Sequence, residues 1–364
     1  MTVADLARDL VAVPSHEDET GAGDAIEAWL RAETDAAVTR DGAGNVLARR
    51  GPADASADAP RSLALVGHHD VVPPDASQVD ADGAYVVAER DGRLHGRGSA
   101  DMKGALSAAL FAFRDAEPAG ELVFASFVGE EVGGEGVRHA IEAGFSPDYA
   151  VVVEGSTGYS SPGVTDVAVA HKGRRASTIT ARGVSAHASE TGAGENAIYR
   201  ACDAVAVLRD LDRPTAAVLG HDLVGSLEAT EVRGGTAWNV IPDECTVTVD
   251  ERTVPGERAD LDRIEAVEGV AVDVEQDLPP MACDDPAFAD AVLDAARAAQ
   301  DGAPEQVVKP HATDAGWLSQ AGTTCVVCGP AELGQAHTAD ESVDLDVLSR
   351  CRAVYEAVAG SWPA

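Results

Sequence analysis

Lysine, aromatic residues and long apolar runs are scarce in this sequence, and the scarcity excludes several kinds of partner. Only three of the 27 basic residues are lysines (Lys103, Lys172 and Lys309), and 62 acidic residues bring the formal net charge to −35. A field this negative repels phosphate backbones and anionic lipids, so we expect neither nucleic acid nor a membrane as a partner. No apolar run approaches the roughly 18 residues that a membrane helix requires.

Three further signals are absent. The first twenty residues carry Asp5, Arg8 and Asp9 and lack the apolar segment of a secretory signal. Cys325 and Cys328 form a CxxC without a second pair, and the apolar run around them favours buried, reduced thiols over a zinc site. No glycine-rich stretch matches the phosphate-binding pattern GxxxxGK(S/T), which argues against a nucleotide. We therefore expect a cytoplasmic protein.

What the sequence does have is an ordinary apolar content, with acidic residues in every segment. Hydrophobic residues make up 45% of the chain, which excludes intrinsic disorder in spite of the charge. Because the acidic residues are spread along the chain rather than gathered in a tail, we interpret them as a solvated surface. Such a surface is typical of a protein from a halophile, which works in concentrated salt.

The first 172 residues alternate strand and helix patterns, as expected of a three-layer α/β domain. The strand patterns are apolar on both faces, which predicts a sheet covered on both sides. The expected strands are 62–66, 122–128 and 149–153 and the helices 3–12, 22–32 and 103–116, with a hairpin at 85–94 and a polar loop at 51–60.

Residues 173–280 have a different pattern. Strands are expected at 176–181, 224–232, 245–249 and 270–274 and helices at 196–211 and 256–267. This β-α-β-β-α-β order predicts a ferredoxin-like α+β domain. The α/β pattern returns in 281–364, with helices at 286–299, 313–320 and 344–359 and a strand at 323–328. We therefore predict one large domain made of 1–172 and 281–364, into which the smaller domain, 173–280, is inserted.

Residue types that ligate metals follow the expected strands of the large domain. They are His68 and Asp70 after the first strand, Glu130 and Glu131 after the second, Glu154 after the third, His337 in the loop after the last strand, and Asp101 just before the helix at 103–116. In open α/β sheets, sites form beyond the carboxyl ends of the strands. The sequence therefore predicts that these side chains converge at one edge of the sheet.

This mixture of imidazole and carboxylate suits divalent metal chemistry. Zinc binds histidine nitrogen and carboxylate oxygen, and a catalytic site keeps one position open for water. Two metals roughly 3.5–4 Å apart need a bridging carboxylate and acidify a shared water. In extended chain, His68 and Asp70 share a face, so that Asp70 can orient the imidazole. Glu130 and Glu131 point to opposite sides, so that one can ligate metal while the other acts as a general base.

Three segments around these residues resemble the metal motifs of a known family. They are 67–73 (GHHDVVP), 96–104 (GRGSADMKG) and 129–131 (GEE). The chain is therefore similar to the dizinc aminoacylase and carboxypeptidase family, which includes acetylornithine deacetylase, succinyl-diaminopimelate desuccinylase and carboxypeptidase G. The resemblance covers nearly the whole chain. It implies a zinc-exopeptidase-like catalytic domain with an inserted lid and dimerisation domain, and hence a homodimer.

The resemblance also implies a ligand set for two divalent ions. His68 and Glu154 would bind one zinc, His337 and Glu131 would bind the other, and Asp101 would bridge them. Glutamate at position 154 is typical of the deacylase and carboxypeptidase branch rather than the tripeptidase branch. Cobalt and manganese are alternatives to zinc, because carboxylate-rich sites accept several metals.

Further roles follow from the same resemblance. Glu130 would act first as general base and then as general acid, and Asp70 would position the neighbouring histidine. Segments 183–189 and 194–197 resemble the family's lid motif, in which His187 would polarise the scissile carbonyl from the same or the partner subunit. Asn239 and Arg252 would hold the substrate carboxylate, for which the planar fork of arginine is well suited.

The remaining histidines and one aspartate are predicted to have structural roles. We expect His69 to be a packing residue and Asp314 to cap a helix. We expect surface or capping positions for His16, His95, His139, His171, His221 and His311.

The expected activity is metal-dependent hydrolysis of the amide bond of an N-acyl amino acid, of the acetylornithine deacetylase or succinyl-diaminopimelate desuccinylase type in amino-acid biosynthesis. The alternatives are a dipeptidase or carboxypeptidase, or a hydrolase that releases lysine or ornithine from an amino-group carrier protein. A non-catalytic dimeric scaffold is a further hypothesis. Loss of Glu130 or Asp101 would have favoured the scaffold, and both residues are present.

Overall fold

The computed structural model describes residues 1–51, 61–118 and 120–362, which form two compact units. The first unit comprises Met1–His171, Met281–Lys309 and Thr313–Ala364. The second comprises Lys172–Pro280 and Pro310–Ala312. Of the polar loop predicted at 51–60, all but Gly51 lies outside the described residues.

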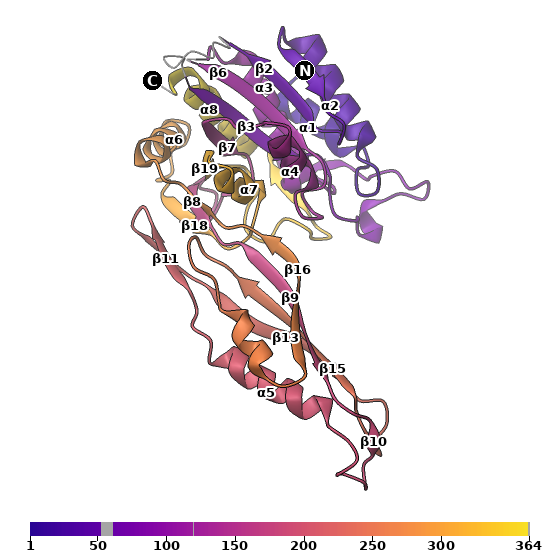
Figure 1. The fold of residues 1–364 in the computed structure, drawn as a ribbon. Helices are drawn as coiled ribbons and strands as arrows, with labels where there is room; N and C mark the ends of the chain where they lie inside the picture. The colour runs from indigo at the N-terminus through magenta and orange to yellow at the C-terminus, as the bar shows by residue number, and fades with distance from the viewer. Residues whose placement is uncertain (52–60, 119, 363–364) are drawn as a thin grey trace. The chain divides into compact units, whose positions relative to one another are not determined.

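A mixed sheet, nine-stranded when counted over the described residues, forms the centre of the first unit (Figure 1). Its strands run in the order β1-β2-β6-β3-β7-β19-β8-β17, with β18 beside β8. β3 is parallel to β6 and β7, and β7 is parallel to β19, whereas β2 and β17 join antiparallel. The strands are β1 (Ala37–Arg40), β2 (Val46–Arg50), β3 (Ser62–His68), β6 (Glu121–Phe127), β7 (Tyr149–Val152), β8 (Val167–His171), β17 (Met281–Ala282), β18 (Gln306–Lys309) and β19 (Thr324–Val327).

Helices cover both faces of this sheet, which is why its central strands are apolar on both sides. Ala64 and Val66 of β3 pack in one core with the side chains of α4 and α7. Because side chains alternate along a strand, Phe124 of β6 faces the other way, and its ring lies 6.1 Å from that of Phe113 in α3. The helices of the first unit are α1 (Val3–Val11), α2 (Thr20–Glu33), α3 (Gly104–Asp115), α4 (Glu135–Glu142), α6 (Pro286–Ala298), α7 (Asp314–Gln320) and α8 (Leu345–Ser361). This architecture confirms the predicted α/β fold.

Polar side chains determine where several of these helices begin. Thr2 and Asp5 form a capping box at α1, in which each side chain accepts the other residue's backbone N–H. Asp285 caps α6, whose first residue is Pro286, and Asp344 caps α8. Aspartate and threonine at these positions satisfy N–H groups that the helix itself leaves unpaired.

A small three-stranded sheet lies beside the segment that carries Asp101. It consists of β4 (Ala88–Arg90), β5 (Arg93–His95) and β20 (Ser342–Asp344). Asp91 and Gly92 connect β4 to β5 with φ angles of 51° and 75°, as a type I′ turn requires. The hairpin predicted around these two residues is therefore confirmed. β20 contacts the short helical segment Ser99–Lys103.

The second unit contains a four-stranded antiparallel sheet, in the order β13-β15-β9-β16, against which α5 packs. The helix predicted at 256–267 is wrong in extent, since only Leu261–Ala266 is helical, as a 3-10 helix. Gly256 has a φ of 97°, and short 3-10 turns commonly serve as connectors. The elements are β9 (Arg174–Arg182), β13 (Ser226–Gly234), β15 (Glu244–Arg252), β16 (Val270–Leu278), α5 (Ala197–Arg209) and two short pairs, β10 (Ala186–His187) with β14 (Val240–Ile241) and β11 (Thr215–Val218) with β12 (His221–Val224).

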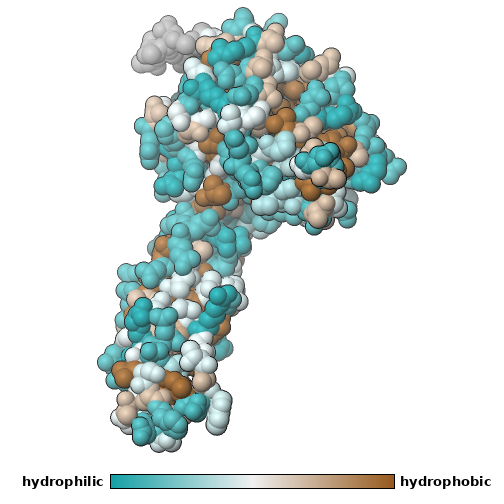
Figure 2. All heavy atoms as spheres, turned by 90° about the vertical axis from the view of Figure 1, so that its right-hand side faces the viewer, coloured by the Kyte–Doolittle hydropathy of each residue, from teal (hydrophilic) through white to brown (hydrophobic). Residues whose placement is uncertain are grey.

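The surface and the thiols agree with the composition. Figure 2 shows a face covered mostly by hydrophilic residues, with small hydrophobic groups between them. All six cysteines are free, and only Cys202 is exposed. Within the described ranges, we find no helix that is both long and apolar enough to cross a membrane.

Candidate metal centre

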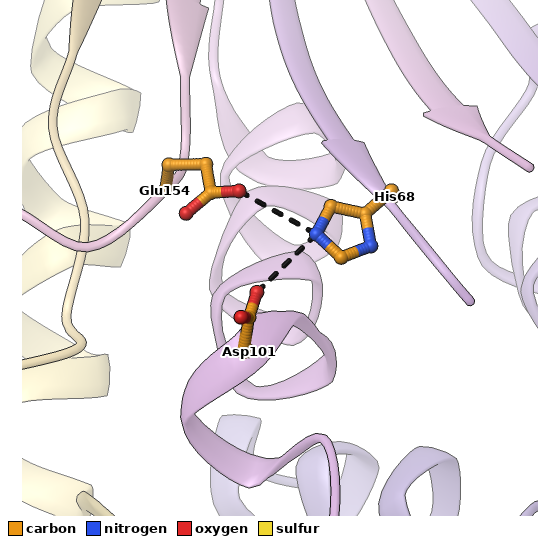
Figure 3. A group of neighbouring side chains, drawn as sticks. All are labelled: His68, Asp101 and Glu154. Carbon is orange, nitrogen blue, oxygen red and sulfur yellow. Dashed lines mark ion pairs between the residues drawn. The ribbon is translucent and has the colours of Figure 1, made fainter. Parts of the chain in front are cut away.

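The carboxyl ends of neighbouring parallel strands bring a first group of candidate ligands together. His68 is the last residue of β3, Glu154 follows β7, and Asp101 lies in the short helical segment Ser99–Lys103. Their side chains point toward one another in Figure 3. Nε2 of His68 lies 3.3 Å from Oδ1 of Asp101 and 3.4 Å from Oε1 of Glu154. The group therefore occupies the edge of the sheet where α/β folds bind ligands.

A second group forms around His337. Nε2 of His337 lies 3.1 Å from Oδ2 of Asp101 and 2.8 Å from Oε1 of Glu131. Asp101 thus contributes one oxygen to each group. In both groups one imidazole and two carboxylates offer ligand atoms that lie within 4.8 Å of one another. The two groups differ in burial, since the His68 side chain is 2% exposed and the His337 side chain 50%.

The first group contains buried polar atoms that a bound cation would satisfy. Nε2 of His68 and Oδ1 of Asp101 are buried, and neither has a hydrogen-bond partner in the part of the chain that the structure describes. Such unsatisfied atoms destabilise a fold, and native structures contain few of them. The nitrogen and oxygen donors are the types that zinc and related divalent metals prefer. The donor types of these residues therefore fit divalent metal ions.

The crowding of carboxylates changes the protonation of the imidazoles. Hydrogen bonds to Asp101 and Glu131 raise the pKa of His337 to about 10. Burial alone would lower the pKa of His68, but Asp70 and the other neighbouring carboxylates raise it well above its usual value. Without a metal, these shifts favour the protonated form of both imidazoles. A metal ion must displace these protons in order to bind.

Asp70 connects two of the segments that carry ligands. Nδ1 of His68 lies 3.1 Å from the carbonyl oxygen of Asp70 and 3.2 Å from its Oδ1, so that Nε2 faces the ligand group. Oδ2 of Asp70 accepts a hydrogen bond from the backbone N–H of Glu131 at 3.0 Å. Burial tends to raise the pKa of Asp70, but His68 and the N–H of Glu131 lower it overall. Asp70 therefore contacts the imidazole on the side away from the ligand group.

Glu130 lies next to a candidate ligand, and its carboxylate lies within 4.8 Å of ligand atoms of both His68 and Glu131. It follows β6 in a turn in which its carbonyl oxygen accepts the N–H of Gly134. Burial raises the pKa of Glu130 well above its usual value, and Asp314, Glu154 and Glu131 add to the rise. A carboxyl with a raised pKa can accept a proton and later return it near neutral pH. These are the properties that a general base and acid requires.

A buried ion pair that the sequence analysis missed holds the backbone of Asp101. Oε1 of Glu341 accepts hydrogen bonds from the N–H groups of Ala100 and Asp101, at 3.0 and 3.1 Å. Oε2 of Glu341 lies 2.5 Å from Nη1 of Arg97, and the two side chains are 0% and 4% exposed. Arg97 belongs to the motif at 96–104, which could have drawn attention to it. No sequence signal separates Glu341 from the other acidic residues.

A buried lysine, also missed, contacts the first ligand group. Nζ of Lys309 lies 3.4 Å from Oε2 of Glu154 and donates a hydrogen bond to the carbonyl oxygen of Gly155 at 2.9 Å. Lys309 is the last residue of β18, a strand too short and irregular in pattern for the sequence to predict. The sequence feature that could have drawn attention to Lys309 is the rarity of lysine in this chain.

Two of the predicted structural roles are wrong. Thr313, not Asp314, caps α7, because its hydroxyl accepts the N–H of Ala315. Asp314 is buried, and neither of its carboxylate oxygens has a hydrogen-bond partner among the described residues; burial raises its pKa to about 8. His171 is fully buried rather than at the surface, because it ends the internal strand β8, and its Nε2 lies 3.2 Å from Oγ1 of Thr313.

The other histidines agree with their predicted roles. His69 is buried, with Nδ1 2.9 Å from Oγ of Ser126, and therefore packs within the core. The residues that lie exposed or half-buried are His16, His95, His139, His221 and His311.

The three remaining candidate residues belong to the second unit. His187 is exposed on β10, with Nδ1 2.7 Å from Oγ of Ser189. The N–H of Ala188 donates to the carbonyl oxygen of Asn239 at 2.9 Å, so that residues 187–188 and 239 lie side by side. Nε of Arg252 lies 2.8 Å from Oδ1 of Asp250. These contacts place the three residues within their own unit.

The sequence and the fold both match known hydrolases. A model of peptidase family M20/M25/M40 matches residues 64–361. An acetylornithine deacetylase from Myxococcus xanthus is 32% identical over 319 residues, which cover 80% of this chain and 78% of the relative. An N-formyl-4-amino-5-aminomethyl-2-methylpyrimidine deformylase from Halalkalibacterium halodurans is 27% identical, over 79% of this chain and 76% of the relative.

Solved structures with low sequence identity share the fold. Aminopeptidase PepT from Bacillus cereus has a TM-score of 0.79 at 18% identity, over 98% of this chain and 97% of its own. A metallo-carboxypeptidase from Sulfolobus solfataricus has a TM-score of 0.77 at 14% identity, over 100% and 99% of the two chains. A dinuclear metal binding peptidase from Bacillus subtilis has a TM-score of 0.68 at 18% identity, over 98% and 96%.

Proposed function

We propose a specific assignment of this protein's site residues and substrate, on the premise that the chain belongs to peptidase family M20/M25/M40. Membership makes the protein a metallohydrolase that acts on an amide or peptide bond. One observation carries the assignment: the two oxygens of Asp101 lie close to two different imidazoles, those of His68 and His337. The identity of 32% to an acetylornithine deacetylase supports an N-acyl amino acid as the substrate.

His68 and Glu154 would hold one divalent ion, His337 and Glu131 the other, and Asp101 both. The chemistry that two such ions supply when bound is polarisation of a carbonyl and acidification of a water. Zinc is our proposal for both ions, because each group offers one imidazole nitrogen with carboxylate oxygens. Cobalt and manganese are the alternatives.

The protein's own residues would move the proton and hold the reacting groups. Glu130 would take a proton from the attacking water and return it to the leaving amine, as its raised pKa permits. Asp70 would keep Nε2 of His68 turned toward the ligand group throughout. Charge that develops on the carbonyl oxygen is stabilised best by preorganised groups. We assign His187 to that task, because it is exposed and belongs to the lid-like motif at 183–189.

Asn239 and Arg252 would bind the substrate carboxylate. Backbone pairing holds Asn239 next to the segment of His187, whereas Arg252 is the last residue of β15, at the end of that strand away from Asn239. Asp250 fixes the guanidinium of Arg252 through Nε. An arginine held in this way loses less conformational entropy when it binds a carboxylate. We propose that the second unit, residues 173–280, is the lid and dimerisation domain of a homodimer.

We assign the enzyme to the biosynthetic deacylases, of the acetylornithine or succinyl-diaminopimelate type, and place it in the cytoplasm. We also propose that it works in concentrated salt, because its net charge is −35 and its acidic residues are spread along the chain. A hydrolysis panel in molar salt with added zinc or cobalt tests the substrate. The panel should contain acetylornithine, succinyl-diaminopimelate, acetyl-amino acids and dipeptides. Turnover of dipeptides alone would contradict the deacylase assignment, and no turnover at all would favour a carrier-protein substrate or a scaffold.

A substitution separates the role of Glu130 from that of the ligands. Glu130→Ala should lower turnover at least about a hundredfold and leave the binding of two metal ions intact, because general acid-base catalysis contributes that much and the proposed ligand set does not include Glu130. Glu135→Ala is the matched control, because Glu135 is an exposed glutamate close by in α4. Unchanged turnover in Glu130→Ala would refute the assigned mechanism.

A further inference from the structure

Lys309 is unusual in this chain both by type and by place. Lysines are three of 27 basic residues. In exposed ion pairs such as Arg49 with Glu121 and Arg182 with Glu244, the cation is an arginine. Lys309 is instead buried, with a side chain 8% exposed, beside the candidate metal centre. An ammonium is a compact point charge, whereas a guanidinium is a wide planar fork. The position therefore combines a buried positive charge with a small head group.

The contacts of Lys309 divide the two oxygens of Glu154 between different partners. Nζ lies 3.4 Å from Oε2, while Oε1 lies 3.4 Å from Nε2 of His68 in the first ligand group. The hydrogen bond from Nζ to the carbonyl oxygen of Gly155, at 2.9 Å, fixes the ammonium in this position. Only one oxygen of Glu154 is thus turned toward the ligand group.

The two ligand groups are otherwise alike in composition. Each has one imidazole, one carboxylate of its own and one oxygen of Asp101. The carboxylate of Glu131 lies 2.8 Å from His337, and no described contact pairs it with a lysine or arginine. A positive charge close to one carboxylate, in a buried place, weakens the attraction of that group for a cation. The structure therefore makes the groups electrostatically unequal.

We propose that Lys309 is a positioning residue that makes the two metal sites unequal in affinity. Its ammonium keeps Oε2 of Glu154 away from the ligand group and offsets part of the carboxylate charge, so that the site of His68 and Glu154 binds its ion more weakly than the site of His337 and Glu131. This inference rests on the proposed two-metal function. It goes beyond that function because it assigns the difference between the sites to one residue outside the ligand set.

Stepwise binding of zinc and cobalt, measured by competition with a chelating dye, tests the inference on the full-length protein. Wild type should show two dissociation constants. In Lys309→Met the weaker constant should become at least about tenfold tighter, while the tighter one stays within about threefold, because the lost charge is in contact with Glu154 and acts on the shared Asp101 only at longer range. Lys309→Arg keeps the charge and should keep the weak site. The absorption of bound cobalt should change only for the site that Lys309→Met affects.

A second background shows whether Lys309 acts through Glu154. In Glu154→Gln, the further change Lys309→Met should no longer tighten binding, because the carboxylate charge that Lys309 offsets is gone. If Lys309→Met does not fold, Lys309→Gln, which is neutral and can still donate to the carbonyl of Gly155, carries the same test. Unchanged or weaker binding in the neutral variants, or equal tightening in Glu154→Gln, would overturn the inference. If the wild-type protein does not bind two ions, the proposed function is refuted. If Lys309→Met tightens the weaker metal site but the wild-type protein hydrolyses no substrate, the inference about Lys309 still stands.

Discussion

Replacing Arg97 by methionine should destabilise the first unit in a way that depends on pH. Arg97 and Glu341 form an ion pair in which both side chains are almost fully buried, 2.5 Å apart. Arg97→Met keeps the bulk of the side chain and removes its charge, so that the Glu341 carboxylate loses its ion-pair partner. Burial already raises the pKa of Glu341 with Arg97 present, and loss of Arg97 should raise it further.

The size of the effect follows from the burial of the pair. Removing one partner of a buried ion pair destabilises a protein by about 3–5 kcal/mol. In a unit of about 250 residues, roughly 2 °C of Tm corresponds to 1 kcal/mol, so we expect a Tm lower by about 6–10 °C at about pH 8. A carboxyl with a raised folded-state pKa destabilises the fold as pH rises above its unfolded value. The deficit should therefore shrink toward about pH 5, where Glu341 accepts a proton.

Thermal unfolding by circular dichroism, on metal-free protein across this pH range, measures the deficit. The double variant Arg97→Met with Glu341→Gln should recover much of the lost Tm, because glutamine is neutral and can still accept the N–H groups of Ala100 and Asp101. Arg49→Met is the control, because Arg49 forms a half-exposed pair with Glu121 in the same unit. Such pairs contribute about 0–1 kcal/mol. A deficit that does not vary with pH, or a double variant no more stable than Arg97→Met, would refute the reasoning.

Three further outcomes are expected. Burial raises the pKa of Asp314 from 3.8 to about 8, so the carboxyl favours folding while protonated, and this contribution is lost as pH rises between those values. Asp314→Asn should therefore gain stability over metal-free wild type toward about pH 8 in urea unfolding, and parallel pH curves would contradict the raised pKa. The pKa of His337 is raised to about 10, so zinc binding at about pH 7.5 should release a proton from its imidazole, which calorimetry can measure. In His337→Ala the number of protons released should fall by about one. Equal release from both proteins would be inconsistent with a protonated imidazole. The Tm should rise by several degrees between about 0.1 and about 2 M KCl, as salt screens repulsion among the acidic residues, and a constant Tm would contradict salt adaptation.

The convergence of the ligand residues could be predicted because it depends on local sequence and one topological rule. Each apolar strand ends at a recognisable residue, and parallel strands end at the same edge of the sheet. His68 and Glu154 follow directly from this rule, since both stand at or just after such strand ends. His337 and Asp101 could be placed less directly, in the loop after the last expected strand and just before a helix, because neither ends a regular strand. The structure brings all four together, and their roles as ligands remain a proposal.

The residues that support the ligands could not be predicted, because their positions depend on contacts between distant segments. Glu341 reaches the backbone of Asp101 only because β20 pairs with β5, and no local pattern encodes that pairing. Lys309 reaches Glu154 through the parallel pairing of β18 with β8. The cap of α7 illustrates a smaller difficulty. Thr313 and Asp314 are both good capping residues, and local sequence does not determine which of two adjacent candidates precedes the first helical residue.

The charges around the candidate metal centre explain why the residues beside the ligands matter as much as the ligands themselves. The ligand groups and Asp70 place several carboxylates within a mostly buried volume, and the cations beside them in the described chain include Lys309, which contacts Glu154, and buried Lys103, which attracts Asp70. The raised pKa of His337, to about 10, shows how strongly the cluster attracts positive charge. Two divalent ions would supply the missing charge, so their binding energy would add to the stability of the fold. Each basic residue near the centre therefore lowers the need for an ion at a particular carboxylate.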